Sequence, residues 1–560
     1  MGASRSGSAV ALSLCPWQRR ASSAPADVRP ALAVVLDADD GVIAARVRRV
    51  SAYARLAAVQ RTRRLAVLIL AISLLALSCS DASMGSSGPS TVSGPTTTVT
   101  PTTTVPPETT VAADPETGTR QIAAVPDGIG DRYYPDLGNS GYDVAHYSLA
   151  LEFDPPVLTA QVAIDATATD DLDTFNLDFA GFEISSLTVD GADAPFGREG
   201  TELTIDPTAP LNNGDDFTVI VSYEGEPQPE RSAAIPIPLG WISGENNWYV
   251  ATEPDGAHHW FPANDHPNDK ATFDITIAAP VELYAAANGV LTEITETPVG
   301  PARRYEMDQP MATYLATVVI GDYELVPDAE GTEIAGVEVR NILTPELAAN
   351  PPAAIALQGP MIAFFSELFG PYPFDVYGLA VVNDPRFPAL EMQTLSIFGP
   401  DLISREEVVA HEIAHQWFGN HVSPARWQDV WLNEGFATYA ESLWVNRDLD
   451  RADFDADIAA QRSAYRSNPP FGAQPAGEPD SDNLFNAGVY AMGGFTLHAL
   501  RTEVGDDTFF EILQSWVSRF GGGTASTADF IELSEELHGA SLTELFDLWL
   551  TNPLPPDLGS

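Results

Sequence analysis

Two different spacings of apolar residues divide the chain. Between residues 144 and 321, apolar and polar residues alternate over short runs, which are VAHYSLALEF, LTAQVAIDATA, DFTVIVSY, ATFDITIAA and TYLATVVIG. Turn-forming segments such as NNGDD and DGADAP separate these runs. Because alternation with a period of two is typical of strands with one buried face, residues 119–324 are predicted to form an all-β domain.

After about Leu325, apolar residues recur every three or four positions, as they do on one face of a helix. This spacing runs through AAIALQGPMIAFFSELFG, the segment 404–419, VWLNEGFATYAESLWVN, GGFTLHALRTEV and LTELFDLWL. We therefore expect residues 325–555 to form a mainly helical domain that opens with a few strands. The two halves together predict an α+β protein with more than one domain.

The residues before the β domain show neither spacing. Residues 1–58 are rich in Arg and Ala, and we interpret them as an extension that arises from too early a start, with translation beginning near Val59. Residues 59–79 include RTRRLAVLILAISLLALSC, in which a positive segment precedes a 13-residue apolar run. Such a run is short for a membrane span and typical of a secretory signal, with an uncleaved signal anchor as the alternative.

The sequence ALSC before Ser80 resembles a bacterial lipoprotein cleavage site, with Cys79 as the lipid-bearing residue. Residues 80–118 contain GPTTTVTPTTTVPPETT and are predicted to be a disordered Ser/Thr/Pro-rich linker. The protein is therefore expected to be exported and extracellular or held at the cell surface, with a membrane contact only through Cys79. Both cysteines, Cys15 and Cys79, precede the globular region, which excludes cysteine-based catalysis there.

The charge is strongly negative, with 78 acidic residues against 28 basic ones and a formal net charge of −50. This balance argues against nucleic acid or an anionic membrane surface as a partner. Lys270 is the only lysine, so every other cationic side chain that is always charged is an arginine.

The segment 404–419 carries start and stop signals of a helix. Ser404 and Glu407 have the spacing of a capping box, and Gly419-Asn420 is a typical stop. We therefore predict one helix that spans about residues 404–419.

Within that helix, His411 and His415 lie four positions apart in EEVVAHEIAHQWFGN. Residues with this spacing share a helix face, so both imidazoles would point to one place. The string matches the HExxH motif, in which two histidines bind zinc. A half-buried helix with two hydrogen-bonded histidines is the alternative interpretation.

A catalytic zinc ion normally has three protein ligands and one open position. Glu434, in DVWLNEGFATYAESLW, is the third candidate because it lies 19 residues beyond His415, enough for a turn and a second helix. Taken alone, a glutamate such as Glu434 is more often a solvated helix residue than a metal ligand. A carboxylate among so many large apolar residues needs a cation, however, so we predict a site for one Zn²⁺ per chain.

The HExxH motif, an 18-residue gap and NEGFA together resemble the gluzincin aminopeptidases, the family of aminopeptidase N and leukotriene hydrolase. The segments YYPDLGNSGYDVAHYSLAL, HHWFPANDHPNDKATFDITI, FGPYPFDVYGLAVV and VYAMGG are also similar to segments of this family, so the resemblance covers about residues 131–555. It implies a sandwich-like N-terminal β domain and a thermolysin-like, mainly helical zinc-peptidase domain.

The resemblance also implies roles for individual residues. His411, His415 and Glu434 would hold zinc, and Glu412 would be the general base that acts on the metal-activated water. Tyr490, in VYAMGG, would donate a hydrogen bond to the oxyanion of the tetrahedral intermediate.

Glu441 lies seven residues after Glu434, which is two helical turns along the same face. It could be a hydrogen-bond acceptor for a ligand imidazole, or a surface carboxylate.

An aminopeptidase needs negative groups that bind the α-ammonium of its substrate. The resemblance assigns this role to Glu391, in PALEM, and to Glu253, in VATEPDG. Pro388, Leu390 and Met392 differ from the family's Gly-x-Met-Glu-Asn pattern, which affects side-chain preference and main-chain contacts. The expected function is hydrolysis of the N-terminal peptide bond of peptides that have free N-termini.

Two other functions compete with this one. A thermolysin-like endopeptidase would lack amine-binding carboxylates, and the presence of Glu253 and Glu391 counts against it. An inactive zinc-fold binding protein would be expected to lack Glu412 or Tyr490, and both are present.

The chain ends at residue 560, about where the catalytic domain of the family would finish. The helical C-terminal domain that usually closes the cleft is therefore expected to be absent. Either longer peptides would then enter more easily, or an oligomer would cover the opening.

Overall fold

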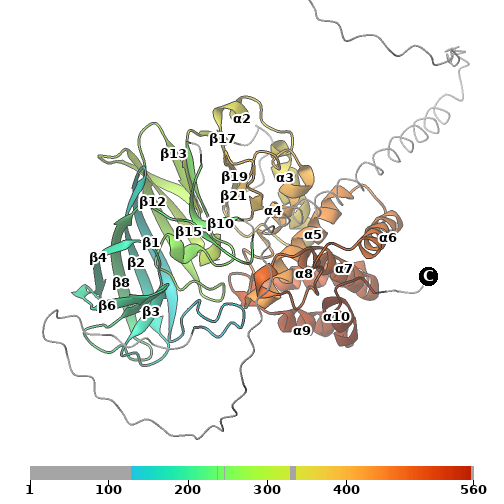
Figure 1. The fold of residues 1–560 in the computed structure, drawn as a ribbon. Helices are drawn as coiled ribbons and strands as arrows, with labels where there is room; N and C mark the ends of the chain where they lie inside the picture. Colours follow the sequence, from blue (N-terminus) through green and yellow to red (C-terminus); the bar gives the residue numbers. More distant parts are fainter. Residues whose placement is uncertain (1–127, 236, 245, 328–335, 557–560) are drawn as a thin grey trace, which may run out of the picture. The chain divides into compact units, whose positions relative to one another are not determined.

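The computed structural model describes residues 128–235, 237–244, 246–327 and 336–556 (Figure 1). The predicted N-terminal extension, signal sequence, lipidated Cys79 and linker fall within residues 1–118, outside the described residues. In the described ranges, no helix is both long and apolar enough to cross a membrane.

The first half of the described chain is built on an eight-stranded sheet with the order β14-β15-β12-β1-β2-β8-β4-β5. Strand β1 (Tyr142–Asp154) pairs antiparallel with β2 (Val157–Ala168) and parallel with β12 (Lys270–Ala278). Alternate residues of these strands are buried, as their alternating sequence predicts. The other strands are β4 (Glu183–Val189), β5 (Ala192–Asp193), β8 (Asp216–Gly225), β14 (Val290–Glu296) and β15 (Pro301–Ala312).

Two smaller sheets complete this half. The five-stranded sheet has the order β13-β16-β11-β10-β9, and the three-stranded sheet has the order β3-β7-β6. Their strands are β3 (Phe175–Asp178), β6 (Phe196–Glu199), β7 (Glu202–Ile205), β9 (Glu230–Arg231), β10 (Pro238–Ser243), β11 (Asn247–Ala251), β13 (Tyr284–Ala287) and β16 (Val318–Gly321). The β-rich N-terminal domain predicted from the alternation is confirmed.

The run TYLATVVIG is a strand over only part of its length. Its first residues form a 3-10 turn, η2 (Thr313–Leu315), and only β16 pairs in a sheet. Within this turn, the hydroxyl of Tyr314 donates to the carbonyl of Gly419 at 3.1 Å. The expectation of one continuous strand was therefore wrong.

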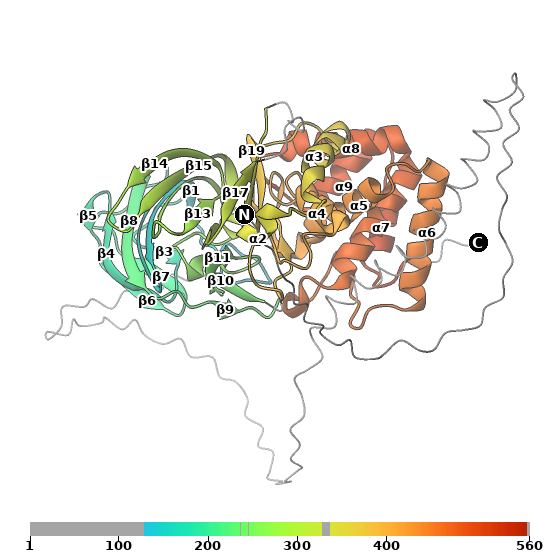
Figure 2. The same cartoon turned by 90° about the horizontal axis from the view of Figure 1, so that it is seen from above.

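The second half opens with a five-stranded sheet of order β17-β18-β19-β21-β20 and continues with helices, as expected. Figure 2 shows α5 between α4 and α7, an arrangement that places three parts of the site together. The strands are β17 (Glu324–Pro327), β18 (Glu338–Leu343), β19 (Val376–Val381), β20 (Ala389–Leu390) and β21 (Ser396–Phe398). A further short pair is β22 (Ser423–Pro424) with β23 (Thr524–Ala525).

The helices are α2 (Pro345–Ala349), α3 (Gln358–Phe369), α4 (Glu406–Ala414), α5 (Trp431–Val445), α6 (Arg451–Ser467), α7 (Ala487–Val504), α8 (Asp506–Phe520), α9 (Thr527–His538) and α10 (Thr543–Leu550).

Helix α4 is shorter than the predicted helix over 404–419. Its N-cap is Arg405 and receives no side-chain cap, so the predicted capping box was wrong. The carboxylate of Glu407 pairs with the Arg405 guanidinium at 3.0 Å instead of reaching back to the main chain. At the other end, regular α-helix stops at Ala414, and a turn follows in which Gly419 has a φ of +112°.

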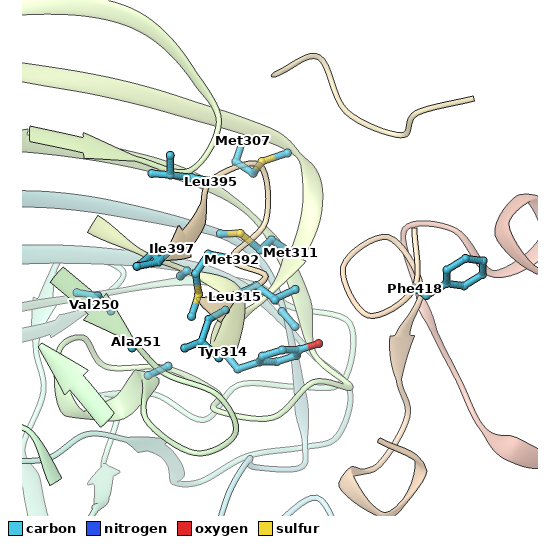
Figure 3. Packing of buried hydrophobic residues seen from close by; sticks show 14 of the residues in the cluster. Val250, Ala251, Met307, Met311, Tyr314, Leu315, Met392, Leu395, Ile397 and Phe418 are labelled. Carbon is cyan, nitrogen blue, oxygen red and sulfur yellow. The ribbon is translucent and has the colours of Figure 1, made fainter. Parts of the chain in front are cut away.

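Apolar side chains from both halves pack into one buried cluster. In Figure 3, Met392, Leu395 and Ile397, from the segment around β20 and β21, lie against Val250, Ala251, Met311 and Leu315. All seven are at least nine-tenths buried. This packing fixes the segment after β20, and with it Glu391, against the β11 and β15 region.

Candidate active site

Two histidines and a glutamate converge between α4 and α5. His411 Nε2 lies 3.2 Å from Glu434 Oε2, and His415 Nε2 lies 3.5 Å from the same oxygen. Ligand atoms of a tetrahedral zinc ion with bonds of about 2.0–2.1 Å lie about 3.4 Å apart. The three donors therefore have the chemistry and the spacing that zinc requires, and all lie within 4.8 Å of one another.

The helices place these side chains by burying their other faces. Val409 and Ile413 of α4 are fully buried, and so is Ala437 of α5. The histidines lie on the face of α4 that meets the first turn of α5. Glu434 is only 3% exposed, so its carboxylate is held away from solvent.

Each histidine has an acceptor near its second ring nitrogen. His415 Nδ1 lies 3.1 Å from the carbonyl oxygen of Phe418, and His411 Nδ1 lies 3.6 Å from Glu441 Oε2. A partner at this position fixes the orientation of a metal-binding imidazole. Glu441 thus lies where the sequence analysis put it, although 3.6 Å is longer than a hydrogen bond.

Glu412 lies on the same helix and is 5% exposed. Its carboxylate and that of Glu391 lie within 4.8 Å of a ring nitrogen of His415. Burial raises the pKa of Glu412 to about 8.

Glu253 and Glu391 form a buried carboxylate pair. Glu253 follows β11, Glu391 follows β20, and their carboxylates lie within 4.8 Å of that of Glu434. They are 2% and 3% exposed, and the Oε1 atom of each has no hydrogen-bond partner among the described residues. Burial, followed by repulsion from neighbouring carboxylates, raises the pKa of Glu253, and burial raises that of Glu391. Such a pair requires a cation or protons.

Tyr490 reaches the same place from α7. Its hydroxyl donates to Glu434 Oε1 at 3.1 Å, and its ring lies parallel to that of His411 with centroids 6.1 Å apart. The structure thus brings together all seven residues that the sequence analysis gave a metal, catalytic or amine-binding role, with Glu441 beside them.

A buried polar network that the sequence did not predict supports these residues. Gln416 and Asn420 donate side-chain hydrogen bonds to the main-chain oxygen of Glu391, at 3.1 and 2.6 Å. Asn433, next to Glu434, donates to the hydroxyl of Tyr314 at 3.3 Å. The signal for them was weak, since it consisted only of amide side chains within otherwise apolar runs.

The sequence matches two family models. The Peptidase M1 N-terminal domain model matches residues 144–315, and the Peptidase family M1 domain model matches residues 354–549. Aminopeptidase M1-B of Oryza sativa subsp. japonica is 26% identical over 420 residues, which are 70% of this chain and 45% of that protein. Aminopeptidase M1-C of the same organism is 28% identical over 315 residues, 52% and 35% of the two chains. The chain spans less than half the length of these relatives.

Solved structures match over a larger share. An M1 zinc metallopeptidase from Deinococcus radiodurans is 32% identical, with a TM-score of 0.70 over 77% of this chain and 99% of that one. A two-domain M1 zinc metallopeptidase, solved as a mutant with L-tryptophan, is 31% identical, with a TM-score of 0.70 over 77% and 100% of the chains. With this agreement in sequence, fold and donor set, the chain belongs to the M1 family of zinc metallopeptidases.

Proposed function

We propose that this protein is a zinc-dependent aminopeptidase that removes single residues from peptides with free N-termini. The observation that carries the proposal is the pair Glu253 and Glu391, two buried carboxylates beside the His411, His415 and Glu434 triad, each with one oxygen that has no hydrogen-bond partner among the described residues. A substrate α-ammonium between them supplies the missing positive charge and hydrogen-bond donors.

The names of similar proteins support this proposal. The curated relatives described above are aminopeptidases. Related M1 structures contain a Tyr-Ser-Ala substrate, L-tryptophan or L-arginine, and all of these carry a free α-amino group.

In the proposed hydrolysis, each of these residues has its own part. His411, His415 and Glu434 would hold zinc, which supplies Lewis acidity toward a carbonyl oxygen and toward water. Glu412 takes a proton from the attacking water onto its carboxylate and passes it to the leaving amine as the C–N bond breaks. The Tyr490 hydroxyl donates to the oxygen that becomes negatively charged when the carbonyl carbon turns tetrahedral.

The carboxylate pair also sets which bond is cut. Because Glu253 and Glu391 lie within 4.8 Å of Glu434, a peptide held by its amine places its first peptide bond at the triad. A peptide without a charged amine leaves both carboxylates buried and unpaired, which costs binding free energy.

The test compares one peptide in its free and N-acetylated forms in a time course followed by mass spectrometry. We expect single residues to be released in order from the free form and almost no cleavage of the acetylated form. Similar cleavage of both forms, or internal cuts before terminal ones, would contradict the exopeptidase function and favour a thermolysin-like endopeptidase.

We also propose that the enzyme is exported and anchored by a lipid at Cys79. This proposal rests on the arginines and the 13-residue apolar run before ALSC, and on the Ser/Thr/Pro-rich segment 80–118 that follows. Mass spectrometry of the native protein should detect no peptide from residues 1–78 and a diacylated Cys79. A soluble chain with an unmodified N-terminus elsewhere would argue for simple secretion.

A further inference from the structure

Lys270, the only lysine of the chain, makes an unusual set of contacts. It is the first residue of β12, and its ammonium donates to the carbonyls of Asn420, His421 and Gly523 at 2.7, 3.1 and 3.4 Å. No carboxylate of the described residues pairs with it. Burial lowers the pKa of Lys270 to about 7, whereas the three carbonyls act in the opposite direction because they favour the charged form.

The first two of these carbonyls belong to residues 418–422, which form the turn after α4; we call it the zinc-helix turn. The third, that of Gly523, also accepts from the main-chain N–H of Ser423 at 3.1 Å, so it ties the start of β23 to the same turn. Lys270 thus joins the eight-stranded sheet to the zinc-helix turn through a single charged group.

The zinc-helix turn controls two groups of the proposed active site. The carbonyl of Phe418 lies 3.1 Å from His415 Nδ1, and the side chain of Asn420 donates to the Glu391 carbonyl at 2.6 Å. A shift of this turn would therefore rotate a metal-binding imidazole and move one acid of the amine-binding pair.

The residue type fits this position. An ammonium has three N–H donors around one nitrogen, so it can satisfy three carbonyls that converge on one point. A guanidinium is a wider planar fork that suits carboxylates. In a chain that otherwise uses only arginine as its permanent cation, Lys270 stands where an arginine would not reproduce the contacts.

We propose that Lys270 is a positioning residue for the reaction: by holding the zinc-helix turn, it places Glu391 for the substrate ammonium and orients His415. It contacts neither the substrate nor the triad and acts through Asn420 and Phe418. The inference rests on the proposed aminopeptidase function.

The experiment compares the zinc-loaded wild type with Lys270→Met, which keeps an apolar side chain of similar length, and Lys270→Arg, which keeps the charge. The control is Arg304→Met, which removes a partly exposed cation from the same sheet, where it pairs with Asp274 and Glu306. For each protein, kcat and KM are measured on a free-amine peptide, together with the Ki of L-arginine and the zinc content.

We expect both Lys270 variants to keep about one zinc per chain while KM and Ki rise about tenfold, and kcat to change less, since ground-state binding of the amine is affected most. Arg304→Met should match the wild type in all four quantities.

A lower kcat with unchanged KM and Ki would overturn the proposal, because loss of folded enzyme reduces only the number of active sites. If Lys270→Met does not accumulate as folded protein, the test rests on Lys270→Arg alone. Wild-type values of KM and Ki in Lys270→Arg would then overturn the proposal. These outcomes differ from failure of the proposed function, which would show as wild-type enzyme that cleaves the acetylated peptide.

Discussion

Gly435 of α5 and Gly493 of α7 are in contact where the two helices cross, and a Cβ atom on Gly493 would lie 2.7 Å from the Cα atom of Gly435. Gly435 follows Glu434 of the donor triad, and Gly493 lies almost one turn beyond Tyr490. The missing side chains therefore allow the approach in which the Tyr490 hydroxyl reaches Glu434 at 3.1 Å.

Gly493→Ala should separate the two helices, because the new methyl group meets main-chain atoms that cannot turn aside. We expect kcat to fall at least about tenfold and unfolding free energy to fall by about 1–3 kcal/mol, the usual cost of overpacking, with zinc retained. The matched control is Gly494→Ala, whose methyl group would lie 3.4 Å from the side chain of Thr438, an ordinary contact. Equal activity of the two variants would contradict this account of the crossing.

Zinc analysis separates the ligands from the base. Glu434→Ala should lose the metal, since it removes one of three donors. Glu412→Gln should keep about one zinc per chain and lower kcat by roughly two or more orders of magnitude, because the amide cannot accept the proton. Elemental analysis and steady-state kinetics on the same preparations check both results. Loss of zinc from Glu412→Gln would mean that Glu412 is a ligand.

Glu391→Ala should lower kcat/KM for free-amine peptides by about a hundredfold or more, equivalent to about 3 kcal/mol of transition-state binding. Its carboxylate lies beside Glu253 and has an oxygen without a hydrogen-bond partner among the described residues, so the substrate loses a charged contact that nothing replaces. The same variant should discriminate far less between free and acetylated peptides. A variant that keeps wild-type selectivity would place the amine-binding site elsewhere.

Asp178 should make the β domain less stable as pH rises. It is fully buried, accepts from the main-chain N–H groups of Gly138 and Asp265, and its Oδ1 atom has no partner among the described residues. Burial, with repulsion from Asp265, raises its pKa to about 8. The folded state therefore holds a proton that the unfolded state releases near pH 4, and stability falls between these values by up to about 1.4 kcal/mol per pH unit.

Asp178→Asn removes this titration and keeps an oxygen for the two N–H donors. Its stability relative to the wild type should rise from pH 5 to pH 8, as measured by urea unfolding at each pH. The exposed Asp193→Asn is the control and should shift stability by the same small amount at both pH values. A constant difference for Asp178→Asn would mean that Asp178 stays ionised when folded.

The sequence predicted the features that depend on neighbouring residues. The alternation over β1, β2 and β12 matches strands whose alternate residues are buried. The convergence of His411 and His415 could be predicted because a helix brings residues four apart to one face. The local sequence did not predict the 3-10 turn at Tyr314 or the early end of α4, because contacts between distant segments decide the conformation there.

The remaining parts of the site depend on long-range contacts that no spacing encodes. Lys270 contacts residues 150 and more positions away, and Tyr314 reaches a carbonyl 105 positions away. The acceptor for His415 is a main-chain oxygen, which any residue type could supply. Glu253 and Glu391 come from different sheets, so only the resemblance to a family, and not their spacing, suggested that they meet.

Because the chain has a single lysine, proteolysis at that residue can report how often one contact opens. A lysine-specific protease can cut this chain at one peptide bond, the bond after Lys270, which lies at the start of β12. The bond becomes accessible only when the first residues of the strand leave the sheet and the ammonium leaves its three carbonyls. The rate at which the two fragments accumulate under native conditions thus measures how often the contact between Lys270 and its three carbonyls opens. The measurement needs no label and no mutation.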